Sequence, residues 1–146
     1  MIYEVQIRPT TFADEKEVLG LIEELENRVF DCGIFAGIFK SYLEDPLTLM
    51  KVAVAEDDRI CGFISSKGQP LLHHEGLVFE IQELIVTSDH QGRGIGKKLI
   101  ESLKPELSRL GAKSLEVTSN KRRKEAHAFY QSVGFKNSHE KFTIYF

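Results

Sequence analysis

The sequence predicts a mixed α/β (α+β) domain in which one mostly antiparallel sheet carries helices on both faces. Two observations lead to this fold class. Segments with the two-residue alternation of strands take turns with segments whose apolar residues recur at helical spacing. The chain has 146 residues, which is the size of one domain with a real core but not of two. We therefore expect a single domain over residues 1–146.

The first half of the chain is expected to form a strand, two helices and a hairpin. Residues 3–8 alternate like a short strand and end at Pro9. A first helix, capped by Thr11 or Asp14, is expected to run to about Val29, because its apolar residues recur every three or four positions. The remaining elements of this half are a helix over 34–43 and hairpin strands over 52–56 and 60–66.

The second half alternates strands and helices. A long strand over 77–86 leads into a glycine-rich turn, and the following helix ends near Gly111, which suits a left-handed C-terminal cap. A strand over 114–118, a helix over 125–133 stopped by Gly134 and a closing strand over 142–146 complete the chain. Because crossovers between parallel strands are right-handed, we expect 77–86 and 114–118 to be parallel neighbours.

Composition excludes several classes of partner. The formal net charge of −3 offers no positive footprint for a nucleic acid. No apolar run approaches the roughly 20 residues that span a bilayer, and the N-terminal segment lacks a signal-peptide pattern. The two cysteines, Cys32 and Cys61, have no C-x-x-C spacing and are expected to be reduced. We therefore expect a cytoplasmic protein that binds neither nucleic acid nor membrane.

The run Gln91-Gly92-Arg93-Gly94-Ile95-Gly96 lies between the 77–86 strand and the next helix. Glycines let a ligand approach the backbone, and the first N–H groups of a helix bind anions at the positive end of its dipole. This order of elements predicts a phosphate site, with a tight turn that binds nothing as the alternative. A Walker loop and the dinucleotide fingerprint are excluded, because Gln91 and Lys97 stand where those motifs need glycine.

The remaining pattern, Q-x-x-G-x-G, resembles the pyrophosphate loop of the Gcn5-related N-acetyltransferases (GNAT), in which coenzyme A lies across the start of this helix. The resemblance implies the GNAT-type acyl-CoA N-acyltransferase fold, with acetyl-CoA as cosubstrate. It also implies that strands 77–86 and 114–118 splay apart, so that the pantetheine arm pairs with the exposed edge of the first. The residues expected to bind the cofactor are Leu84, Ile85, Val86, Gln91, Gly92, Arg93, Gly94, Ile95, Gly96, Lys97, Asn120 and Arg123.

A second part of the resemblance is Asn120 followed by Phe129 and Tyr130. In the family, an asparagine here bonds the cofactor arm and the tyrosine lies beside the thioester sulfur. A departing thiolate has a pKa near ~8.5, so a phenol held close can protonate it. We expect Tyr130 to be this acid; the alternative is a core aromatic, as we interpret Phe129. The basic run 121–124 is either a solvated loop or, as we favour, a contact for the adenosine phosphates through Arg123.

The acceptor amine needs a base, because an alkylammonium has a pKa near ~10 and attacks a thioester only after losing a proton. Glu80 and Glu83 stand three apart on the 77–86 strand, so ideal alternation puts them on opposite faces unless a bulge intervenes. Both match acidic positions of acetyltransferases. We expect Glu80 to be the base and Glu83 to anchor the ammonium; a purely structural carboxylate is the alternative for either. The N–H near Val86 is expected to bind the thioester oxygen.

The resemblance also extends over nearly the whole chain to the aminoalkylphosphonate N-acetyltransferases. It implies acetylation of the amino group of small aminophosphonates, with which a divalent metal is associated. Cys32-Gly33 and residues 47–52 depart from that family in segments that border the acceptor pocket. The residues that carry the resemblance lie at 21–25, 30–31, 45–46, 73–74, 80–84, 118–120, 126–130 and 138–143.

Two further sets of side chains are candidates for ligand contacts. A divalent metal would find imidazole and carboxylate ligands in His74, His139 and Glu80. Adjacent histidines on an extended segment point in opposite directions, so at most one of His73 and His74 faces inward. A phosphonate needs cationic or N–H partners, for which the candidates are Arg28, Lys40 and Lys141.

The leading function is therefore an acetyl-CoA-dependent N-acetyltransferase that acts on a small-molecule amine, in particular an aminoalkylphosphonate. One alternative is an N-acetyltransferase for proteins, peptides or other small amines. The other is a non-catalytic acyl-CoA-binding module, against which the presence of Glu80, Glu83 and Tyr130 argues. Members of the superfamily often dimerise, so a homodimer is the candidate assembly.

Overall fold

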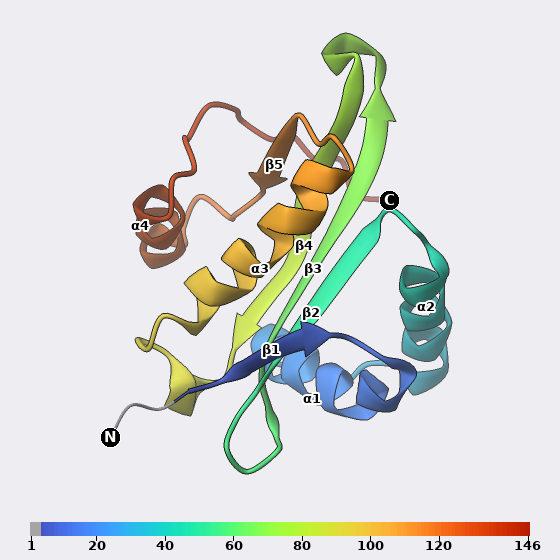
Figure 1. The fold of residues 1–146 in the computed structure, drawn as a ribbon, viewed down its shortest axis with the longest axis vertical. Coiled ribbons are helices and arrows are strands. Elements are labelled where there is room, and N and C mark those ends of the chain that lie inside the picture. Colours follow the sequence, from blue (N-terminus) through green and yellow to red (C-terminus); the bar gives the residue numbers. More distant parts are fainter. Residues whose placement is uncertain (1–3) are drawn as a thin grey trace.

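The computed structural model describes residues 4–146, and Figure 1 shows its elements in space. One sheet runs diagonally through the molecule, with helices packed on both of its sides. Short 3₁₀ turns lie at Phe12–Asp14, Leu72–His74 and Ser88–His90. In chain order the main elements are β1 (Gln6–Pro9), α1 (Glu15–Glu26), α2 (Cys32–Glu44), β2 (Thr48–Val54), β3 (Ile60–Leu71), β4 (Gly76–Val86), α3 (Ile95–Arg109), β5 (Ser114–Val117) and α4 (Lys124–Ser132).

The sheet has the strand order β1-β2-β3-β4-β5. The pairs β1/β2, β2/β3 and β3/β4 are antiparallel, and β5 runs parallel to β4, as the right-handed crossover predicts. Helices α1 and α2 pack on one face through Val18, Leu21 and Phe39, and α3 packs on the other. The predicted mixed fold class, mostly antiparallel with helices on both faces, is therefore confirmed.

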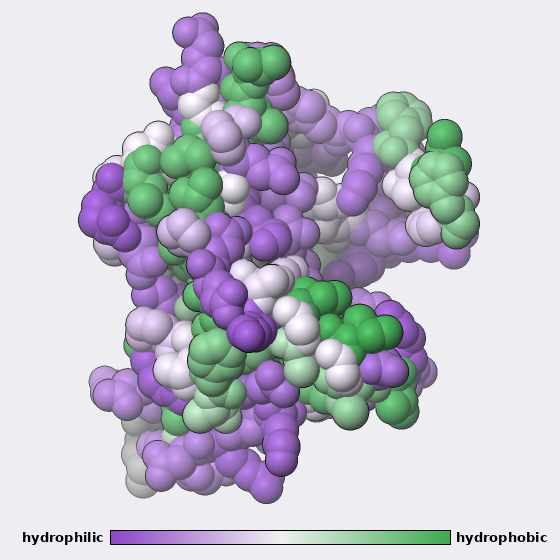
Figure 2. All heavy atoms as spheres, turned by 90° about the vertical axis from the view of Figure 1, so that its right-hand side faces the viewer, coloured by the Kyte–Doolittle hydropathy of each residue, from purple (hydrophilic) through white to green (hydrophobic). Residues whose placement is uncertain are grey.

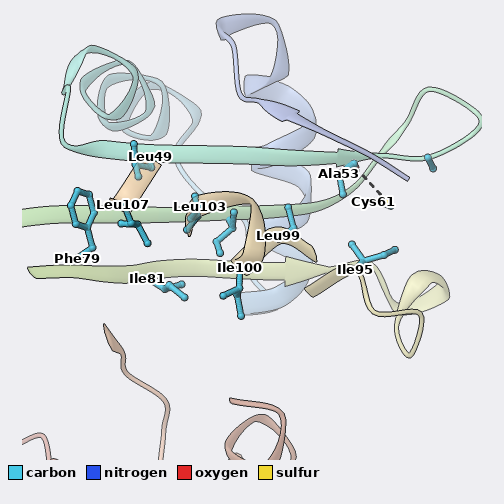
Figure 3. Packing of buried hydrophobic residues seen from close by; sticks show 12 residues of the cluster. Leu49, Ala53, Cys61, Phe79, Ile81, Ile95, Leu99, Ile100, Leu103 and Leu107 are labelled. Carbon is cyan, nitrogen blue, oxygen red and sulfur yellow. Dashed lines mark hydrogen bonds between the residues drawn. The ribbon is translucent and has the colours of Figure 1, made fainter. Parts of the chain in front are cut away.

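Helix α3 fixes the position of the glycine-rich turn that precedes it. Its buried residues recur every three or four positions, so they form a single stripe against the sheet. Figure 3 shows this stripe pointing at side chains of β2, β3 and β4. The stripe consists of Ile95, Leu99, Ile100, Leu103 and Leu107.

Leu99→Ala is expected to lower the free energy of unfolding by about 2–5 kcal/mol, because it opens a cavity in a close-packed core. Leu99 has no exposed surface. Urea unfolding measures the change, and Leu72→Ala is the matched control, because Leu72 is 98% exposed and its loss should cost less than about 0.5 kcal/mol. Equal effects of the two substitutions would contradict the assigned role of Leu99.

Most predicted elements are present, but some of their bounds differ from those expected. Tyr3, where the first strand was expected to begin, lies outside the described residues. Helix α1 ends at Glu26 instead of reaching Val29, because Asn27 adopts the left-handed conformation with φ 53°. The Phe30 N–H then donates to the Glu23 side chain at 2.7 Å, which turns the chain toward α2.

The predicted closing strand over 142–146 is wrong. These residues form no strand, and the side chains of Phe142 and Ile144 are 88% and 81% exposed. Their alternation is typical of a strand, but a strand also needs a neighbour for its backbone hydrogen bonds, and β5 pairs only with β4. In Figure 2 an arm with hydrophobic atoms stands off the body at the height where Figure 1 marks the C-terminus.

Residues 4–146 contain no helix that is both long enough and apolar enough to cross a bilayer.

Candidate functional site

Strands β4 and β5 separate in the middle of β4. The two strands pair only from Val78 opposite Ser114 to Ile81 opposite Val117. Strand β4 continues to Val86, and no other described strand pairs with it on that side. The Thr87 N–H donates to the Cys61 carbonyl on β3, so by alternation the N–H groups of Leu84 and Val86 point to the open edge. The expected splay is therefore present.

A β-bulge lies where the strands separate. Glu83 is opposite Ser65 and Ile81 is opposite Ser66, so Gln82 has no partner on β3. Beyond the bulge, Glu80 is opposite Lys67. Ser65 and Lys67 are two apart on β3 and share a face, so the bulge brings Glu80 and Glu83 to the same face, the one that α1 and α2 cover. Without the bulge the two carboxylates would lie on opposite faces.

The glycine-rich turn has the backbone shape of an anion site. Gly92 and Gly94 have φ values of 77° and 78°, a conformation that side-chain-bearing residues rarely adopt. No atom would lie within 4 Å of a Cβ at either position, so the surface of the turn is open. The first intrahelical bond of α3 runs from the Lys98 N–H to the Gly94 carbonyl. The N–H groups of residues 95–97 are therefore left for a ligand.

Two contacts hold this turn in place. The Gln91 side-chain amide donates to the Val86 carbonyl at 3.1 Å, which attaches the turn to the end of β4. A Cβ on Gly96 would lie 3.1 Å from the Phe129 ring, so the third glycine allows α3 and α4 to approach closely. Gln91 and Gly96 thus shape the site, while the backbone of Gly92, Gly94, Ile95 and Lys97 faces the open side.

Two cavities meet beside Glu83. The main cleft, of about 380 Å³, is lined by Ile22, Leu25, Glu26, Arg28, Phe30, Ile81, Gln82, Glu83, Leu84, Val117, Thr118, Arg123 and Tyr130. The side chamber, of about 390 Å³, is lined by Val18, Ile22, Arg28, Phe30, Asp31, Ile34, Phe35, Ile38, Phe39, Tyr42, Phe63 and Glu83. Four residues line both cavities: Ile22, Arg28, Phe30 and Glu83. Glu83 is the acidic residue at this junction.

The Glu83 carboxylate is held by its neighbour on β3. The Ser65 hydroxyl donates to Glu83 Oε1, and the Glu83 N–H donates to Ser65 Oγ at 3.1 Å. Burial raises the pKa of Glu83 above its ordinary value, and Ser65 and the Lys67 charge oppose this only in part. A carboxylate with a raised pKa is a stronger base, so Glu83 is better suited than an ordinary glutamate to accept a proton.

Tyr42 of α2 faces the same carboxylate. Burial, together with the charge of Glu83 and a side-chain interaction with it, raises the pKa of Tyr42 to about 12. The phenol therefore keeps its proton at neutral pH and presents it to the Glu83 side of the chamber.

Glu80 lies outside the lining of both cavities. The Thr118 hydroxyl donates to its Oε2 at 3.0 Å, and the Gln82 side-chain amide donates to its Oε1 at 3.2 Å. These bonds connect the bulge to the residue after β5. The placement favours Glu83 over Glu80 for direct contact with a substrate, whereas the sequence analysis expected Glu80 to be the base and Glu83 to anchor the ammonium.

Tyr130 reaches the main cleft from α4. Its ring packs edge-on against Phe129 and Phe135, with centroid distances of 5.4 and 5.7 Å. Burial raises the pKa of Tyr130, and the nearby Arg123 charge opposes this only in part. The phenol is therefore protonated at neutral pH, as a proton donor must be.

Asn120 and Arg123 lie in the turn between β5 and α4. The Asn120 side-chain oxygen accepts the Arg122 N–H at 2.9 Å, and its carbonyl accepts from His127 Nε2 at 2.8 Å. Asn120 therefore shapes this turn. Arg123, expected from the sequence to reach the adenosine phosphates, lines the main cleft near Tyr130.

The residues that the sequence analysis named as possible metal ligands are not arranged to bind a metal ion. Among residues 4–146, no three His, Cys, Asp or Glu side chains are grouped so that they could hold a metal ion. The rings of His73 and His74 lie 4.2 Å apart in the turn between β3 and β4, His139 Nδ1 bonds the Ser138 hydroxyl, and Glu80 is held by Thr118. The structure does not bring the set His74, His139 and Glu80 together.

The three candidate partners for a phosphonate are placed differently. Lys40 is exposed and lies 3.8 Å from Glu44, and Lys141 is in the exposed C-terminal arm. Arg28 lines both cavities, with its guanidinium carbon 4.0 Å from the centre of the Phe30 ring. Of the three, the structure brings Arg28 to the site.

Ser65→Ala is expected to move the acidic limb of the kcat/KM profile to higher pH. The Ser65 hydroxyl stabilises the ionised Glu83 and lowers its pKa, so its removal raises that pKa further. Ser66→Ala is the matched control: Ser66 is equally buried, but its hydroxyl has no hydrogen-bond partner in the described structure. An acidic limb that stays in place or moves to lower pH in Ser65→Ala would contradict this role.

Sequence reasoning missed Ser65, Tyr42 and the phenylalanines of α2 as parts of the site. They come from two elements, β3 and α2, whose proximity depends on the packing of α2 against the sheet. No local pattern marks them, because a serine in a strand and aromatics on a helix are ordinary core residues.

Comparisons with known proteins agree with this geometry. A sequence profile of the family described as "Acetyltransferase (GNAT) domain" matches residues 49–137, which include β4, the glycine-rich turn and Tyr130. The chain is 35% identical over 138 residues to the aminoalkylphosphonate N-acetyltransferase of Salmonella typhimurium. That alignment covers 94% of this chain and 89% of the relative.

Solved structures share the fold. A transcriptional regulator from Bacillus halodurans C-125 has a TM-score of 0.88 and 24% identity, covering 98% of this chain and 100% of that one. A glucosamine-6-phosphate N-acetyltransferase from Arabidopsis thaliana has a TM-score of 0.82 and 21% identity, covering 98% and 99%. The arrangement of sheet and helices is therefore one that solved structures already contain.

Proposed function

The chain belongs to the GNAT family of acetyltransferases, and we propose that it transfers the acetyl group of acetyl-CoA to the primary amine of a small aminoalkylphosphonate. The observation that carries this proposal is the position of Glu83. This half-buried carboxylate with a raised pKa lines the same cleft as Tyr130, at the point where a second cavity opens. The named relative, at 35% identity, supports the phosphonate. The domain proposed for this activity spans residues 1–146.

The open turn and the free edge of β4 fit coenzyme A. The N–H groups of residues 95–97 would bind the pyrophosphate, because Gly92 and Gly94 leave the surface of the turn open to it. The open edge at Leu84 and Val86 would pair with the amides of the pantetheine arm, and Val86 N–H would bind the thioester oxygen. Acetyl-CoA would supply the acetyl group as an activated thioester.

Glu83 and Tyr130 divide the proton transfers between them. Glu83 takes a proton from the substrate ammonium, because only the free amine attacks a carbonyl carbon. When the amine has attacked the thioester carbon, the carbon–sulfur bond breaks and Tyr130 gives its proton to the departing sulfur, which stabilises the leaving group. The second proton that the nitrogen loses as the amide forms then returns the Tyr130 phenol to its protonated form. Glu80, bonded to Thr118, keeps the bulge and the end of β5 in register, so we propose it as a positioning residue.

Arg28 and Arg123 are the cationic side chains of the main cleft. Neither forms an ion pair within residues 4–146, so both guanidinium groups can bind an anion. A phosphonate carries the charge and the oxygen atoms that guanidinium groups recognise. We propose that these two arginines hold the phosphonate while the amine faces Glu83.

Free-thiol release from acetyl-CoA tests this function. The acceptors are aminomethyl-, 1-aminoethyl- and 2-aminoethylphosphonate, a polyamine, an aminoglycoside and a histone-like peptide, each with and without a divalent metal. We expect the phosphonates to be preferred. Turnover of the peptide instead would favour a protein acetyltransferase. Binding of acetyl-CoA without turnover of any amine would favour a non-catalytic acyl-CoA-binding module.

For location and assembly we propose the cytoplasm and a homodimer. Both cysteines are unpaired, which suits a reducing compartment.

A further inference from the structure

We propose that the acceptor carries an apolar group beside its amine and its anion, and that this group occupies the side chamber between α1 and α2. The inference rests on the proposed N-acetyltransferase function and adds a substrate class to it. The favoured acceptor is a 1-aminoalkylphosphonate whose first carbon also bears a bulky alkyl or aromatic group.

The size of the two cavities is the first reason. Aminomethylphosphonate has about six non-hydrogen atoms, and at roughly 30 Å³ each, the volume share of a water molecule, it needs about 200 Å³. The main cleft, of about 380 Å³, accommodates such a molecule together with the acetyl group and sulfur of the cofactor, which have four non-hydrogen atoms and need about 120 Å³ by the same rule. The side chamber adds about 390 Å³ that a small aminophosphonate leaves empty of substrate.

The chemistry of the side chamber is the second reason. Its floor consists of Val18, Phe39 and Phe63, which are at most 4% exposed. Its outer wall on α2 includes Ile34 and Ile38, which are 66% and 53% exposed and would be covered by an apolar ligand. Hydrophobic atoms gather over this region of the surface in Figure 2. The chamber therefore suits an apolar group far better than an anion.

The positions of the charged residues orient the acceptor. Arg28 and Arg123 both line the main cleft, so the anion is expected to bind there. Arg28 also lines the side chamber, at the junction of the two cavities. Glu83 lines both cavities. The acceptor would thus place its anion in the main cleft, its amine at Glu83 and its apolar group in the side chamber. The three positions adjoin at the junction of the two cavities. A single carbon that bears all three groups matches this junction.

The shared chemistry of anion, amine and apolar group is found in phosphonates and in amino acids, so the test includes both. We compare kcat/KM for 1-amino-2-phenylethylphosphonate, aminomethylphosphonate and phenylalanine. We expect kcat/KM for 1-amino-2-phenylethylphosphonate, called the phenyl phosphonate below, to exceed that for aminomethylphosphonate at least tenfold. Phenylalanine as the better substrate would keep the chamber assignment and make a carboxylate the anion.

Ile38→Asp tests the chamber itself, because Ile38 is partly exposed and a charge there should be tolerated by the fold. It should lower kcat/KM for the phenyl phosphonate at least tenfold more than for aminomethylphosphonate. Ile144→Asp is the matched control: the same substitution in the exposed C-terminal arm, outside both cavities, should change neither value.

Two results separate this inference from the proposed function. Turnover of aminomethylphosphonate equal to or better than that of the phenyl phosphonate would overturn the inference and leave the function standing. Binding is measured independently as the rise in Tm that each phosphonate causes in the presence of coenzyme A. A larger rise with the phenyl phosphonate but no turnover would keep the chamber and overturn the function; no larger rise would overturn the chamber.

Discussion

Glu83→Gln is expected to lower kcat/KM at least about 100-fold, which is the lower range of the contribution of a positioned base. Glutamine keeps the size of the side chain and a partner for Ser65, but it cannot accept the ammonium proton. The loss should be greatest near neutral pH and shrink as the pH approaches the pKa of the amine, near ~10, where free amine is already present. Steady-state kinetics across that pH range measure both effects.

Glu80→Gln is the matched control for this prediction. Glu80 is on the same strand and face, but it is bonded to Thr118 and Gln82 and lines neither cavity. Its replacement should cost less than about tenfold in kcat/KM and leave the acidic limb of the profile in place. A larger loss in Glu80→Gln than in Glu83→Gln would return the base to Glu80, as the sequence suggested.

Tyr130→Phe is expected to lower kcat at least about 100-fold while the affinity for acetyl-CoA changes little. The substitution keeps the ring that packs on Phe129 and Phe135 and removes the proton that the leaving sulfur needs. Pre-steady-state turnover and calorimetric binding of acetyl-CoA separate the two quantities. Equal losses of turnover and affinity would show that the hydroxyl serves binding rather than proton transfer.

Tyr145→Phe provides the control for removal of a phenolic hydroxyl. Tyr145 is 89% exposed in the C-terminal arm and lines neither cavity, so its replacement should change neither kcat nor the affinity for acetyl-CoA.

The sequence predicted the elements whose causes are local. Gly111 adopts the left-handed conformation expected at the end of α3, and the Asp57-Asp58-Arg59 turn joins β2 to β3. The parallel pairing of β4 and β5 also follows from a general rule of handedness. These confirmed expectations rest on turn residues and on the handedness of crossovers, which do not depend on side chains far away in the sequence.

Features that depend on distant residues were not predictable in this way. The bulge at Gln82 is set by the pairing of β4 with β3, and it decides which face Glu80 and Glu83 share. The side chamber depends on how α1 and α2 pack on the sheet. The strand expected at 142–146 is absent for the same reason. Alternation of apolar residues does not show whether the segment lies beside the edge of a sheet with which it could pair.

The reaction of acetyl-CoA with aminomethylphosphonate, followed together by phosphorus NMR and by free-thiol release, tests the central claim most directly. The account predicts that the phosphonate resonance moves to that of the N-acetyl product at the rate at which thiol appears, and that Glu83→Gln slows both signals together. Thiol release without any change in the phosphonate resonance would contradict it, because the acetyl group would then be going to water or to another acceptor.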